Sequence, residues 1–221
     1  MHQVHAASPD HRPTAAASGT TPTGVYYEVH GTNGPALFLA FPVTASPDAL
    51  PAGSRGPLAD SFLPLLTDRF RVILADYPSI GRSATVPPAQ LTIQRVCADL
   101  LAVIDAAGFD QVAWWGGTFG AIAGLHLAAA HPQRISALIS AGWPPLEGPY
   151  TAMLRGARIN LPDPPPHARA ILREPGQYAQ WITLYESILR LPRPEALART
   201  HCPSLLVYGA DSVSDVAGIP L

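Results

Sequence analysis

The sequence predicts an α/β fold, a doubly wound and mostly parallel sheet with a small helical lid. Short apolar runs bounded by Gly, Pro and Asp alternate with segments whose apolar residues recur at helical spacing. This alternation is typical of a parallel sheet covered by helices on both faces. The 221 residues are 48% apolar and 14% charged, which is enough for one sizeable core in one domain.

The sequence predicts an N-terminal tail followed by a series of strands and helices. Residues 1–23 are rich in Pro, Ser, Thr and Ala, so we expect a disordered tail there and a domain over 24–221. The apolar runs predict strands over residues 24–31, 36–41, 71–77, 111–115, 135–141 and 205–209. Helical periodicity predicts helices near 58–66, over 92–108 and over 119–130. We expect the strands to bury Leu37, Phe38, Ile73, Leu74, Val112, Ile139, Leu206 and Val207.

The alternation stops between Gly142 and Pro203, so we interpret residues 143–203 as a helical lid insertion. One helix there has a strong apolar face, made of Tyr178, Trp181, Ile182, Tyr185, Ile188 and Leu189. These side chains either pack the helix onto the core or cover the strand ends, and both interpretations can hold together.

Composition excludes several classes of partner. The formal net charge is −2 and no basic stretch stands out, which argues against nucleic acid and anionic membranes. The N-terminus lacks the apolar centre of a secretory signal, and the two cysteines form no disulfide framework, so we expect a cytoplasmic protein. No cluster has metal-ligand spacing, so neither metal nor cofactor is implied. The expected partner is a small-molecule substrate.

A glycine-rich turn joins the strand at 111–115 to the next helix and reads Gly116-Gly117-Thr118-Phe119-Gly120. Such turns also occur in dinucleotide-binding folds, but "GGTFGA" lacks the full Gly-x-Gly-x-x-Gly spacing and follows a middle strand. The turn combines with "FLAFPVTAS", "RVILADYPSIGRS" and "HCPSLLVYGADSVSD" in an order and spacing that resembles the α/β-hydrolase superfamily, from about Gly24 to Asp215.

The resemblance implies a nucleophile elbow. Thr118 would be the nucleophile, and the backbone N–H groups of Phe41 and Phe119 would form the oxyanion hole. Asp211 and Asp215 compete for the role of the acidic triad member, and the residues leave that choice open. We expect an apolar binding pocket lined by Phe41, Trp114, Phe119, Trp143, Trp181 and Tyr185.

The sequence departs from the family pattern at three places. Threonine replaces the usual serine, and its β-branched side chain is poorly suited to the positive φ of an elbow. Leu39-Ala40 stands where His-Gly is usual. No histidine follows Asp211 or Asp215, so the base is expected in sequence not present here, unless the chain lacks the proton relay. Asp76 is expected to be structural, bonded to nearby loop N–H groups.

Two functions remain open. The first is a hydrolase of a small apolar ester, thioester or amide. The alternative is a non-catalytic ligand-binding protein on the same fold, because a fold does not fix function. We also expect self-association through the apolar strand near residues 205–208, which would lie exposed at the edge of the sheet.

Overall fold

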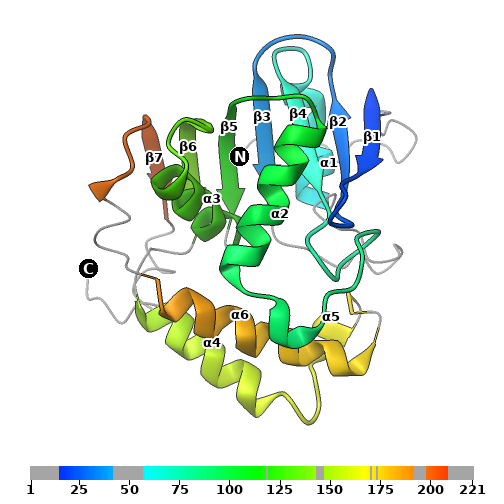
Figure 1. The fold of residues 1–221 in the computed structure, drawn as a ribbon, viewed down its shortest axis with the longest axis vertical. Helices are drawn as coiled ribbons and strands as arrows, with labels where there is room; N and C mark the ends of the chain where they lie inside the picture. Colours follow the sequence, from blue (N-terminus) through cyan, green and yellow to red (C-terminus); the bar gives the residue numbers. More distant parts are fainter. Residues whose placement is uncertain are drawn as a thin grey trace, which may run out of the picture.

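A seven-stranded sheet forms the centre of the molecule, in the strand order β1-β2-β4-β3-β5-β6-β7 (Figure 1). The computed structural model describes residues 15–41, 57–117, 119–142, 147–169, 171–172, 174–191 and 198–208. The strands are β1 (Ala17–Thr20), β2 (Tyr26–His30), β3 (Ala36–Ala40), β4 (Arg71–Ala75), β5 (Val112–Gly117), β6 (Ile135–Ala141) and β7 (Ser204–Val207). Strand β2 pairs antiparallel with both of its neighbours, β1 and β4. The remaining pairs, β4–β3, β3–β5, β5–β6 and β6–β7, are parallel. The predicted fold class is confirmed.

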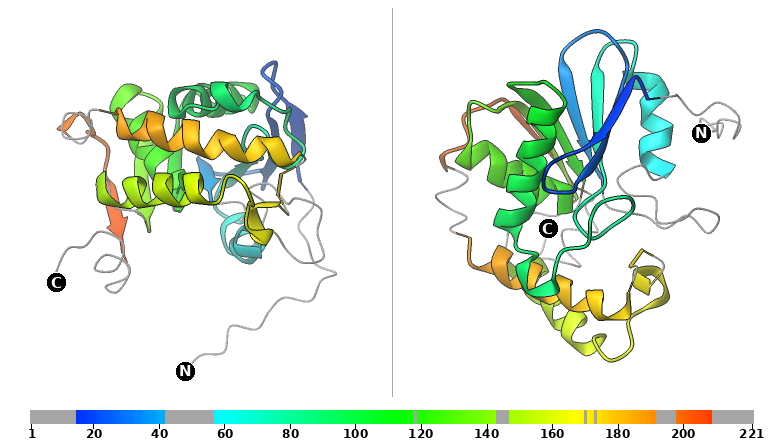
Figure 2. Two further views of the ribbon diagram at one scale, coloured as in Figure 1. Left: turned by 90° about the horizontal axis from the view of Figure 1, so that it is seen from below. Right: turned by 45° about the vertical axis from the view of Figure 1, so that its right-hand side comes forward.

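Helices cover both faces of this sheet (Figure 2). They are α1 (Pro57–Leu66), α2 (Ile93–Ala106), α3 (Phe119–Ala130), α4 (Glu147–Ile159), α5 (Pro166–Arg169) and α6 (Gln180–Leu189), with 3₁₀ turns η1 (Pro88–Gln90) and η2 (Pro175–Ala179). Helix α1 covers one face, and α2 and α3 cover the other. No helix of the described residues is long and apolar enough to cross a membrane.

The core divides into two clusters because neighbouring strand residues point to opposite faces. Phe38 and Trp114 belong to the larger cluster under α2 and α3, whereas their neighbours Leu39 and Trp115 pack with α1. The prediction of burial is confirmed for Leu37, Phe38, Ile73, Leu74 and Val112, while Ile139 is half-buried.

The predicted tail is wrong at its end, because β1 lies within it. Residues Ala17–Thr20 pair antiparallel with Tyr26–Val29 through the backbone, and the chain reverses at Gly24, where φ is +87°. The strand is mostly exposed and polar, so it carries no apolar pattern. Its stability comes from backbone pairing, which composition does not reveal.

The predicted burial of Leu206 and Val207 is also wrong. Their exposed fractions are 50% and 45%, and Leu205 is 56% exposed. The reason is the position of β7, which is the outermost strand of the described sheet and pairs there with β6 alone.

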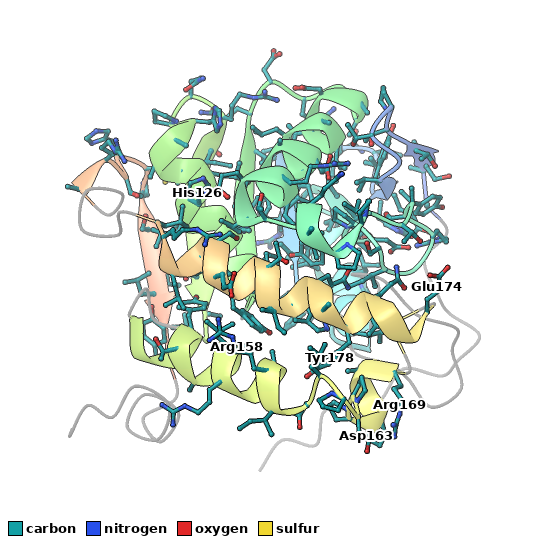
Figure 3. All side chains as sticks on the ribbon, turned by 60° about the horizontal axis from the view of Figure 1, so that its bottom comes forward. His126, Arg158, Asp163, Arg169, Glu174 and Tyr178 are labelled. Atoms are coloured by element: carbon teal, nitrogen blue, oxygen red, sulfur yellow. The ribbon has the colours of Figure 1, made fainter. Side chains whose placement is uncertain are left out.

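Helices α4, α5 and α6 lie together at the carboxyl end of β5 (Figure 1). Helix α6 is tied to the body of the protein, because Ile93 N–H at the start of α2 donates to Ser187 Oγ at 2.8 Å. Leu184 and Ile188 of α6 are buried in the larger core cluster. Helix α6 also contacts α4, where Arg158 Nη2 donates to Glu186 Oε1 at 2.8 Å. Arg158 is labelled on α4 in Figure 3.

Candidate active site

The turn between β5 and α3 is very tight. Strand β5 ends at Gly117 and α3 begins at Phe119, so the apex is Thr118, which lies outside the described residues. A Cβ atom on Gly116 would overlap the carbonyl of Gly120, and one on Gly120 would overlap the carbonyl of Ala40. Both glycines therefore permit the close approach of strand and helix that an elbow requires.

The two predicted oxyanion donors lie on either side of this turn. Phe119 is the first residue of α3, and the first N–H groups of a helix have no partner within the helix. Phe41 directly follows Ala40, whose carbonyl meets Gly120. The Phe41 ring is buried with Phe62 and Trp115 in the cluster under α1. Only its backbone N–H is therefore available for the predicted role.

A cavity of about 460 Å³, within the range of small-molecule sites, lies between the elbow and helices α4 to α6, which are called the lid helices below. Its wall comes from the loop after β4, from Phe119 of α3, from the region of η1 and α2, and from helices α4 to α6. The lining residues are Tyr77, Pro78, Ile80, Leu91, Val96, Phe119, Tyr150, Met153, Gly156, Ala157, Asn160, Pro165, Ala168, Ile171, Tyr178, Trp181, Leu184 and Tyr185.

No residue of this described lining carries a formal charge, and the polar side chains are four tyrosines and Asn160. Tyr77 lies beside the elbow, with its ring edge-on to Phe119 at 5.4 Å between centroids. The Tyr77 hydroxyl is buried, and no described group bonds to it. Burial, with a smaller contribution from Cys97, raises the pKa of Tyr77 far above its usual value, so the hydroxyl stays protonated. Burial likewise raises the pKa of Tyr185.

The structure brings some predicted site residues together and separates others. Trp181 and Tyr185 line the cavity. The prediction that Trp114 lines the pocket is wrong. This side chain is 1% exposed, stacks on Phe38 and donates from Nε1 to Gly120 O at 2.9 Å. Trp143, Asp211 and Asp215 lie outside the described residues, as Thr118 does.

Sequence reasoning missed Tyr77, Tyr150 and the walls from α4 and α5. Tyr77 had a usable signal, because it stands just after β4 and ligands of open α/β sheets bind beyond the carboxyl ends of strands. Tyr150 and Met153 had none, since a separate lid helix supplies them.

No histidine is among the described lining residues. His30 is fully buried elsewhere, with Nε2 at 3.0 Å from Glu28 Oε2. His126 lies in α3 (Figure 3), and burial, aided by His131 and Arg199, lowers its pKa. The described residues also contain no group of three His, Cys, Asp or Glu placed to hold a metal ion.

Asp76 supports the loop that forms one wall of the cavity. Its Oδ2 accepts from the backbone N–H of Arg82 at 2.8 Å and from Arg82 Nε at 3.0 Å. Arg82 also donates to Glu28 Oε1 at 2.7 Å and lies over the Tyr26 ring. The structural role predicted for Asp76 agrees with these bonds, which fix the loop that carries Tyr77.

A tight elbow after a central parallel strand, facing a cavity under a helical lid, is the architecture of an α/β-type hydrolase. The family model for the alpha/beta hydrolase fold matches residues 49–163. A protein of Caulobacter vibrioides named as the carbamate hydrolase RutD is 30% identical over 208 residues, covering 87% of this chain and 73% of the relative. The zearalenone hydrolase of Bionectria ochroleuca is 32% identical over 121 residues, 52% of this chain and 42% of that protein.

A solved structure shows the same fold. The enol-lactonase of Burkholderia xenovorans superposes with a TM-score of 0.64 at 17% identity, covering 88% of this chain and 81% of the other. The chain belongs to the alpha/beta hydrolase family.

Proposed function

We propose that this α/β-hydrolase-type hydrolase cleaves a small apolar ester, open or cyclic, or the corresponding thioester or amide, with Thr118 as nucleophile. The observation that carries the proposal is the position of Phe119, which both begins the helix after the elbow and lines the cavity. A carbonyl bound in the cavity would thus lie next to the apex hydroxyl and to the free N–H groups of α3.

The chemistry would proceed in two steps. The Thr118 oxygen attacks the carbonyl carbon while a base removes its proton, and the alkoxide that forms accepts hydrogen bonds from the N–H groups of Phe41 and Phe119. The base returns this proton to the leaving oxygen, sulfur or nitrogen as the carbonyl re-forms, so an alcohol, thiol or amine departs and leaves an acyl-threonine. Water, losing a proton to the same base, then attacks the acyl carbon and releases the acid and the Thr118 hydroxyl. Asp211 or Asp215 would orient the histidine that acts as this base.

The lining supports an apolar substrate over a polar one. The relatives are named for a carbamate and for zearalenone. A simple carbamate consists mostly of polar atoms, and the described walls offer such atoms few partners. An apolar ester instead buries its hydrocarbon part against these walls and presents only its carbonyl to the elbow.

A non-catalytic binding protein is the second candidate. It is favoured by one observation, the absence of histidine, aspartate and glutamate from the described cavity lining. A binder would need only the cavity, whereas a hydrolase needs a base within reach of Thr118.

Two substitutions at Thr118 separate these functions. In the full-length protein, Thr118→Ala should reduce turnover of p-nitrophenyl butyrate at least about a hundredfold, since losing a single oxyanion donor already costs that much. Thr118→Ser should keep or raise turnover, because it keeps the hydroxyl and removes the methyl group. Thr151→Ala is the matched control, made on the exposed side of α4. Turnover that survives Thr118→Ala would contradict the proposal, and absence of turnover in the unaltered protein would favour the binder.

A further inference from the structure

Gly156 lies in the interior of α4, where glycine is less favourable than alanine. Packing does not require a glycine there, because a Cβ atom on Gly156 would meet no atom of the described residues within 4 Å. Its φ is not positive either. Gly124 of α3 differs, since a Cβ atom on it would overlap the indole of Trp114. The described protein therefore leaves the space beside Gly156 open.

Helix geometry places this open space on the side of the cavity. Residues three and four apart are neighbours on a helix surface, so a side chain at position 156 would stand between Met153 and Asn160. Asn160 continues the helix, because its N–H donates to Gly156 O at 3.0 Å. All three residues line the cavity, as Tyr150 and Ala157 of the same helix do.

Gly156 lies toward the outer end of this wall. Tyr150 is 2% exposed and belongs to the core cluster against which Phe119 of the elbow also packs. Gly156 is half-buried, and Ala152, one turn before it, is exposed. From Tyr150 to Asn160 the wall extends about 15 Å, since each helical residue advances about 1.5 Å. A ligand that reaches from the elbow along this wall is elongated, and its far end passes Gly156.

We propose that Gly156 is a specificity-determining residue, whose missing side chain leaves room for the far end of an extended apolar chain on the ligand. The described lining carries no formal charge, so an apolar chain is a better match for it than an ionised one. The ligand class is an uncharged carbonyl compound with a medium-length apolar chain, such as an ester or a ketone. That this ligand is a substrate rests on the proposed function, whereas its binding does not.

Two methyl ketones that cannot be hydrolysed test the proposal in calorimetry on the full-length protein. They are 2-undecanone, which has a long chain, and 2-hexanone, which presents the same carbonyl on a short one. The unaltered protein should bind 2-undecanone at least about a hundredfold more tightly, because each further methylene group that is buried contributes about fourfold. Equal affinity for the two ketones would overturn the proposal. This comparison needs no variant, so it stands even if a substitution impairs folding.

The variant Gly156→Leu then fills the open space. It should weaken binding of 2-undecanone at least about tenfold, which corresponds to two or more methylene groups kept out of the cavity. It should leave binding of 2-hexanone within about twofold. Ala152→Leu is the matched control, because it places the same leucine at an exposed position of α4 that is not part of the described lining.

Three outcomes with the variants would overturn the proposal. These are unchanged or tighter binding of 2-undecanone in Gly156→Leu, an equal loss for both ketones, or the same loss in Ala152→Leu.

Ester kinetics distinguish this proposal from the proposed function. In a working hydrolase, Gly156→Leu should lower kcat/KM for p-nitrophenyl octanoate at least about tenfold relative to that for p-nitrophenyl butyrate. An unchanged ratio of the two values would contradict the role of Gly156 in substrate selection. The expected ketone results without turnover of either ester would uphold the role of Gly156 in binding while refuting the hydrolase.

Discussion

Gly120 is the residue at which the elbow has least room. A Cβ atom there would overlap the backbone carbonyl of Ala40, and a backbone atom cannot rotate away as a side chain can. Gly120→Ala should therefore push the end of β3 from the start of α3 and lower the free energy of unfolding by about 1–3 kcal/mol. It should also abolish ester turnover, because Phe41 moves with β3. Urea unfolding monitored by tryptophan fluorescence measures the first effect.

Gly156 in α4 provides the opposite case. A Cβ atom on it would meet nothing within 4 Å, so Gly156→Ala removes the entropic cost of a helical glycine without a clash. We expect this variant to be as stable as the unaltered protein or more stable by up to about 1 kcal/mol. If both alanine variants changed stability equally, the close contact at Gly120 would not be the cause.

His126 gives the protein an acid-sensitive site. Its pKa is lowered in the folded state, chiefly by burial, so the folded protein binds this proton less tightly than the unfolded chain does. Protonation therefore favours unfolding, and stability falls as the pH drops through the ordinary histidine pKa of about 6.5. His126→Gln should make the loss of stability between pH 7.5 and 5.5 shallower in thermal melts. His201→Gln, at an exposed position, should leave the loss unchanged.

At the scale of elements, β7 presents the largest run of exposed apolar side chains in a described strand. Leu205, Leu206 and Val207 are all about half-exposed, and edge strands of this kind pair with other chains. We expect concentration-dependent self-association in light scattering, and Leu206→Lys should suppress it. Leu65→Lys on α1 is the control, because that residue is 73% exposed but is the one exposed large hydrophobic side chain among the described residues of its helix. Association that persists in Leu206→Lys would place the contact elsewhere.

The elements with an apolar pattern were predictable, and those without one were not. The boundaries of β6 and α3 agree with the sequence prediction, since each is a largely apolar segment bounded by turn residues. Strand β1 was not predicted, because it is held by backbone pairing with β2 and has no apolar pattern. The sequence assigned Trp114 to the pocket because an apolar strand covered by helices on both faces does not reveal which face Trp114 or Trp115 points to. In the structure the indole of Trp114 fills the space left by Gly124 of α3.

At the scale of the whole molecule, the candidate site joins segments that are far apart in the sequence. The glycines of the elbow could be predicted because local geometry demands them. The cavity could not, because its walls combine the loop after β4, the start of α3 and three lid helices, and nothing local to any of these specifies the others. The sequence thus indicated Trp181 and Tyr185, on the apolar face of one helix, but not Tyr150 on another.

The hydrogen bond from Ile93 N–H to Ser187 Oγ fastens α6, but not α5, to the body of the protein. We therefore expect the backbone hydrogen bonds of α6 to open less often than those of α5. Because α6 is joined to the start of α2 and buries Leu184 in the core, its amide hydrogens should exchange with deuterium about as slowly as those of α2. Those of α5, a single short turn, should exchange much faster. Ser187→Ala should speed exchange at the first turn of α2 and in α6 together, as mass spectrometry of peptides would detect. If α6 exchanged as fast as α5 in the unaltered protein, the whole lid would open as one unit, and a ligand could reach Tyr77 along the entire length of α6.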